Sequence, residues 1–172
     1  MTLHLLTPPQ ESQTALSAAL YAPVAGRAVG LRALAATSPP KQAKLPHPVY
    51  VLGLDKFVGT CRAADAKLVC WRYLVGDSDT HEFAAEIGVD TEKNHHSFSS
   101  FNEGPFVGDT AEQLGVAQRD PRVAAGDYEL RMLRIPALYL MALWLKDNRS
   151  DDDLFIPVGV VQPPLKPSTL YS

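Results

Sequence analysis

Asp77, Asp79 and His81 form the sharpest local pattern of chemically capable residues in the sequence. If the segment is extended, these alternate positions share one face, and two carboxylates converge with an imidazole. Such a set suits a divalent transition metal, with His95 or His96 completing the coordination shell. The Gly-Asp-Ser-Asp string is also typical of a turn in which Asp and Ser bind local backbone groups. A turn without a cofactor is the leading interpretation, and a metal site is the alternative.

His95 and His96 are adjacent in a polar stretch, which predicts a loop. Paired histidines bind metals or move protons, and loops often carry functional residues. Adjacent side chains diverge on a helix or a strand, however, so both rings rarely serve one site. The two histidines are candidate catalytic residues for an enzyme whose site lies near this loop.

Cys61 is the third catalytic candidate, because Arg62 lies beside it in a turn and favours the thiolate. With a histidine as its base it would form a Cys/His enzyme. Cys70 has the surroundings of a strand residue packed in a core. In an antiparallel pair the two cysteines would not be directly opposite, so we expect free thiols and no disulfide. No phosphate-binding glycine loop or Gly-x-Ser-x-Gly elbow occurs in the sequence.

The charge of the 172-residue chain is small overall but unevenly distributed. Sixteen basic and nineteen acidic residues give a net charge of −3, which excludes the global basic field typical of nucleic-acid binding. The segment 76–112 contains nine acidic residues and a single basic one, Lys93. If the protein meets a basic surface of a partner, we expect this segment to bind it.

The longest apolar run, residues 135–145, has eleven residues and is too short for the roughly 18 that a membrane span needs. Arg27 and Arg32 interrupt the alanine-rich stretch that would otherwise resemble a secretory signal. We therefore expect a cytoplasmic protein that does not bind membranes.

Prolines divide the chain, since they cluster near its two ends and around residues 39–48. We expect a single domain over 1–160, followed by a proline-rich tail over 161–172. Within the domain, the composition predicts a helical segment at 8–36, a connector at 37–48 and a sheet-forming part at 49–160.

Runs rich in β-branched and aromatic residues predict the strands, and the first three form an antiparallel meander. The expected strands are 49–58, 67–75, 81–89, 128–134, 137–146 and 154–160. The run 137–146 also suits a helix, because Leu, Met and Ala favour one. Between the third and fourth strands we expect irregular chain with one short helix, begun by a capping box of Asp109 and Glu112. These elements predict an α+β fold, with the helical segment packed on an antiparallel sheet of about five or six strands.

The sequence favours a small binding or accessory protein that acts through a protein–protein or subunit surface. This interpretation depends on the missing catalytic signatures, the proline-rich segments and the acidic stretch. A homo-oligomer formed through a strand edge is one form of it. The alternative is a metal-dependent or Cys/His enzyme with its site near His95 and His96.

Overall fold

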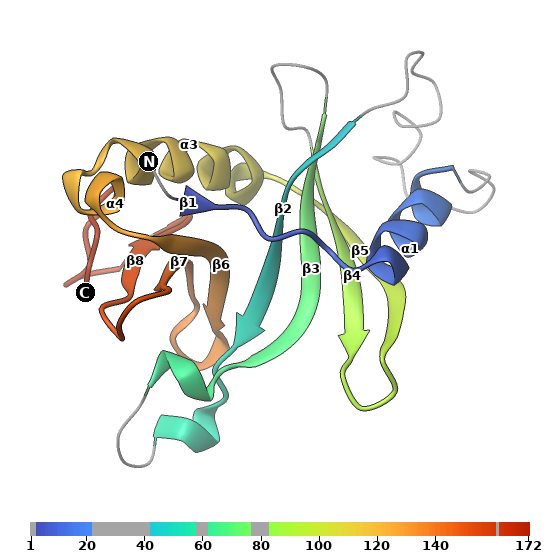
Figure 1. The fold of residues 1–172 in the computed structure, drawn as a ribbon, viewed down its shortest axis with the longest axis horizontal. Coiled ribbons are helices and arrows are strands. Elements are labelled where there is room, and N and C mark those ends of the chain that lie inside the picture. The colour runs from blue at the N-terminus through green and yellow to red at the C-terminus, as the bar shows by residue number, and fades with distance from the viewer. Residues whose placement is uncertain (1–2, 22–41, 58–61, 77–82, 161) are drawn as a thin grey trace.

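A computed structural model describes residues 3–21, 42–57, 62–76, 83–160 and 162–172 (Figure 1). Four of the candidate site residues, Cys61, Asp77, Asp79 and His81, lie outside these ranges. Among the described helices, none combines the length and apolarity that crossing a bilayer requires.

The fold is dominated by one eight-stranded, mostly antiparallel sheet in the order β5-β4-β3-β2-β6-β7-β8, with β1 beside β6. Its strands are β1 (Leu3–His4), β2 (Gln42–Val51), β3 (Lys67–Gly76), β4 (Phe83–Asp90), β5 (His95–Glu103), β6 (Tyr128–Ile135), β7 (Leu140–Asp147) and β8 (Leu154–Pro157). Among the strands described, only the pairs β1–β6 and β2–β6 are parallel. The α+β class is confirmed, as is the strand interpretation of most of 137–146, whereas the strand count exceeds the prediction.

Helices cover both faces of the sheet (Figure 1). They are α1 (Gln10–Tyr21), α3 (Pro105–Arg119) and α4 (Pro121–Ala125), with 3₁₀ turns η1 (Leu54–Phe57), η2 (Ala63–Asp65) and η3 (Pro136–Leu138). On one face, Leu16 of α1 packs in a cluster with Trp71 and Tyr73 of β3. On the other face, Leu114 of α3 belongs to the main core with Val49 of β2, Cys70 of β3 and residues of β6, β7 and β8.

β4 corrects one expectation from the alternation of residues. The pattern predicts a strand with one buried and one solvated face, which would place Glu86 in water. Instead, both Ala84 and Glu86 are buried. Ala84 packs in a cluster with Val107 of α3, which lies over this face. The alternation of polar and apolar residues along β4 does not reveal that a helix covers the second face, because one of the side chains buried there is charged.

β2 begins at Gln42, inside the stretch expected to be a connector. Pro46 fits into this strand because the pairing with β3 is interrupted between Lys44 and His47. Leu45 there has a φ of 48°, and such irregular positions accommodate proline within a sheet.

The segment 90–127 is more regular than the prediction of loops and one short helix. β5 and the fifteen-residue α3 occupy much of it. α3 begins at Pro105, four residues before the expected capping box, because proline at the first helical position starts it. Asp109 is thus inside the helix, and its carboxylate accepts the N–H of Gly159.

Gly159 follows β8 and contacts Phe106 and Asp109 at the start of α3. Its φ is +85°, and a Cβ there would lie 2.1 Å from the Phe106 ring. We expect Gly159→Ala to lower the free energy of unfolding by about 1–3 kcal/mol, measured by urea denaturation. Gly108→Ala is the matched control, because a Cβ at this helical position meets nothing within 4 Å. It should raise stability by roughly 0.5–1 kcal/mol, and equal effects of the two substitutions would contradict this account.

Candidate functional site

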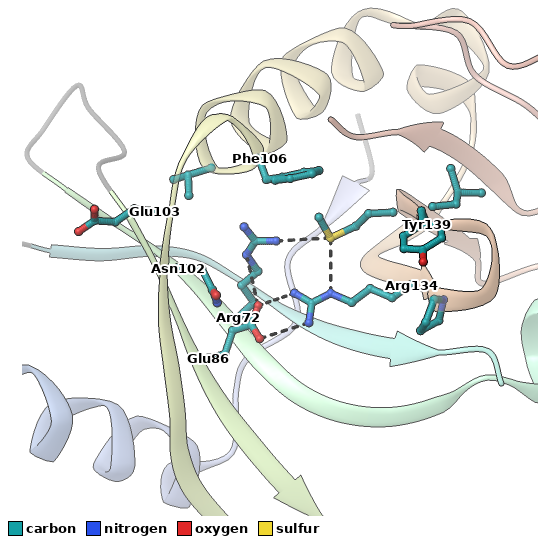
Figure 2. A pocket seen from close by; sticks show the side chains of 11 residues that line it. Arg72, Glu86, Asn102, Glu103, Phe106, Arg134 and Tyr139 are labelled. Carbon is teal, nitrogen blue, oxygen red and sulfur yellow. Dashed lines mark hydrogen bonds and ion pairs between the residues drawn. The ribbon is translucent and has the colours of Figure 1, made fainter. Parts of the chain in front are cut away.

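A cavity of about 470 Å³ opens between the start of α3 and the η3–β7 segment (Figure 2). Its charged cluster consists of Arg72, Glu86 and Arg134, which come from β3, β4 and β6. The remaining lining is mostly apolar and is formed by Phe106, Val107, Pro136, Leu140 and Met141, with Asn102, Glu103 and Tyr139. A few charged groups among apolar walls are typical of a small-molecule site.

Glu86 joins the two arginines. It lies directly opposite Arg72 in the β3–β4 register. Arg134 Nη1 donates to Glu86 Oε2 over 3.2 Å, and its Nη2 donates to Oε1. Arg72 Nε lies 3.9 Å from Oε1, which is an ion-pair distance rather than a hydrogen bond. Arg134 is therefore the main partner of this carboxylate, and Arg72 is paired with it only at longer range.

Arg72 is buried without a strong acceptor of its own. Its side chain is 2% exposed, and within the described chain its Nε–H has no hydrogen-bond partner. Nη1 donates to the Met132 sulfur at 3.4 Å and to the Met141 sulfur at 3.8 Å. The Met141 sulfur also accepts from Arg134 Nε at 3.4 Å. Thioethers are weak acceptors, so both guanidinium groups retain capacity to bind an oxyanion.

His47 lies opposite Arg72 on β2 and adds no charge at neutral pH. Burial is the main cause that lowers its pKa to about 4, and Arg72 and Arg134 act in the same direction. The contact of Nδ1 with the Leu45 carbonyl, at 2.7 Å, assigns the ring proton to Nδ1. Nε2 is therefore an acceptor, and it has no partner among the described residues.

Cys70 is the other titratable neighbour, with its sulfur 3.9 Å from Glu86 Oε2. Burial, assisted by the Glu86 carboxylate, raises the pKa of this thiol to about 12. It is therefore protonated at neutral pH and is a weak nucleophile. With neutral His47 and Cys70, the two guanidinium groups and the single Glu86 carboxylate leave one net positive charge.

The two candidate histidines lie elsewhere. His95 and His96 are in strand β5, opposite Asp90 and Val89, and not in the expected loop. The loop is shorter because the Asp90 carboxylate accepts the N–H groups of Glu92 and Lys93, which makes a tight hairpin turn. Both histidines line an open groove of about 420 Å³ beside α1, separate from the Arg72 cavity. Within the described ranges, no three His, Cys, Asp or Glu side chains lie close enough together to hold a metal ion.

The described acidic residues of 76–112 have different roles. Glu86 is buried in the ion-pair network, while Asp90 and Asp109 accept backbone N–H groups. Glu103 and Glu112 are exposed. Binding of a basic partner by this segment stays a prediction, and Glu86 is unsuitable for testing it.

Sequence reasoning missed the Arg72 cluster, although a signal was present. Arg72 interrupts the apolar run of β3, whose central and C-terminal residues are buried. A charged residue within a buried strand is rarely tolerated unless it is paired. Glu86 and Arg134, its partners in space, are too distant in sequence for a local pattern to identify them.

The low pKa of His47 makes stability depend on pH. As the pH falls below 6.5, the unfolded chain takes up a proton here, whereas the folded protein does so only near pH 4. The unfolded state therefore binds more protons in this window, and acid destabilises the fold. Between pH 7 and 4.5 we expect the wild type to lose roughly 2–3 kcal/mol more than His47→Asn in urea unfolding. An NMR titration in which His47 of the folded protein titrates near 6.5 would contradict this.

Comparison with known proteins gives no indication of the function of this chain. No protein-family model, no curated protein and no solved structure matches the chain. The cavity around Arg72 and Arg134 is therefore the basis on which a function is argued.

Proposed function

We propose that the protein binds a small organic anion in the Arg72–Arg134 cavity. The observation that carries this proposal is Arg72 itself, a buried guanidinium whose nearest acceptors are two thioethers and a carboxylate at 3.9 Å. A buried charge is costly unless strong partners compensate it. An anionic ligand supplies such a partner.

A carboxylate fits the donors in this cavity better than the present acceptors do. Charge-assisted bonds from guanidinium to carboxylate contribute more than bonds to a neutral sulfur, with typical values of about 1.5–3 kcal/mol. Met141 touches both arginines and has a flexible side chain, so a ligand oxygen displaces its sulfur at little steric cost. The volume of about 470 Å³ lies within the range of roughly 300–1,000 Å³ common for small-molecule sites.

Binding of a protein partner or of a second copy is a second proposal. Its support is an exposed apolar segment in η3 and just after it, where Leu138 and Tyr139 project into solvent. Because this segment borders the cavity, ligand binding and partner binding would share residues. The enzyme alternative near His95 and His96 stays a prediction, because the groove that these histidines line contains no buried charged side chain among the described residues.

Arg72→Met tests the anion site directly, because methionine keeps much of the side-chain volume but lacks the charge. With octanoate as the probe, we expect isothermal titration calorimetry to show at least tenfold weaker binding for this variant. Arg131→Met is the matched control. Arg131 is on the opposite face of the sheet, over the Tyr50 and Trp144 rings, and its loss should leave the affinity unchanged.

Two results would overturn the proposal. One is wild-type protein that binds none of octanoate, benzoate and inorganic phosphate. The other is an Arg72→Met variant that remains folded, with a cooperative thermal transition, and binds octanoate as tightly as the wild type.

A further inference from the structure

We infer that the ligand is a monocarboxylate with an apolar body, whose carboxylate lies at Arg72 and Arg134 and whose body extends past Phe106 to Tyr139. This inference rests on the proposed function and names the chemical class of the anion. Its evidence is the charge of the cluster, the character of the walls and two aromatic side chains at the mouth.

The charge of the cluster favours a single negative charge on the ligand. Glu86 already neutralises one of the two guanidinium groups, and His47 is neutral because burial keeps its pKa low. One carboxylate thus balances the remaining charge, whereas a dianion would bring an uncompensated charge into a buried site. Glu103 lies at the rim, and Figure 2 shows its carboxylate turned away from both arginines.

The walls favour an apolar body. Away from the charged cluster and the polar side chains of Asn102 and Glu103, the wall is formed by Val107, Pro136 and Leu140, together with Phe106. These side chains offer contact area but no hydrogen-bonding side-chain groups, so a strongly polar ligand body would lose its hydration without compensation. An alkyl chain or a ring gains from the same burial.

Phe106 and Tyr139 stand on different sides of the mouth (Figure 2). Phe106 is 40% exposed, although it is held against Gly159. Tyr139 is 91% exposed and has a φ of 48°, a conformation that is costly for a residue other than glycine. Large exposed aromatic residues beside an apolar cavity are the groups that a ligand body would cover.

A ligand series separates this inference from the proposed function. Calorimetric titrations with acetate, butanoate and octanoate below its micelle-forming concentration measure the effect of the body. Octanol measures the effect of the charge, and succinate and inorganic phosphate measure the effect of a second charge. We expect affinity to rise at least tenfold from butanoate to octanoate, and octanol, succinate and phosphate to bind at least tenfold more weakly than octanoate.

Variants at the mouth locate the body of the ligand. Phe106→Ala should weaken octanoate several-fold without changing the affinity for acetate. Phe98→Ala is its matched control, because Phe98 is 39% exposed but lies on β5 outside the cavity lining. Tyr139→Ser provides a second test, since a side chain so exposed has little part in folding.

The possible outcomes distinguish a failure of the monocarboxylate inference from a failure of the anion site. Equal affinity for acetate and octanoate, or tighter binding of succinate or phosphate, overturns the monocarboxylate inference but leaves the anion site standing. Octanol that binds as well as octanoate overturns the anion site and leaves only an apolar cavity. If none of these compounds binds, both claims are wrong. Octanoate affinity that is unchanged by both Phe106→Ala and Tyr139→Ser overturns the placement of the body.

Discussion

Three charged side chains meet on the face of the sheet that α3 covers, and each comes from a different strand. Glu86 holds Arg134 through two hydrogen bonds and Arg72 through a longer ion pair. Removal of one partner from such a buried set typically costs about 3–5 kcal/mol, because it leaves an uncompensated charge. The network thus ties β3, β4 and β6 to one another, and it also leaves a positive charge beside the cavity.

The fold was predictable where both the pattern and its cause are local. Runs of β-branched and aromatic residues identified β3, β4 and β6, and the strand interpretation of most of 137–146 is confirmed as β7. The start of β2 was missed because an irregular pairing around Pro46 lets this proline enter the strand. α3 was expected to be shorter because its start depends on Gly104 and Pro105 rather than on a side-chain cap.

The candidate site was much less predictable, and the reason is distance along the chain. The predicted site motifs, such as His95 with His96, contain reactive groups that are adjacent in sequence. The cavity instead combines Arg72, Glu86, Phe106 and Arg134, which only the sheet register and the packing of α3 bring together. The arginine within the apolar run of β3 was the one local sign of this cluster.

The most direct measurement is the NMR spectrum of the arginine Nε–H groups during titration with octanoate. We expect the signals of Arg72 and Arg134 to move progressively and saturate, because the carboxylate replaces the Met141 sulfur, which both groups contact. The Arg131 signal, from the opposite face of the sheet, should stay in place. Saturable binding that leaves the Arg72 and Arg134 signals unchanged would contradict the central claim, because the anion would then lie elsewhere on the molecule.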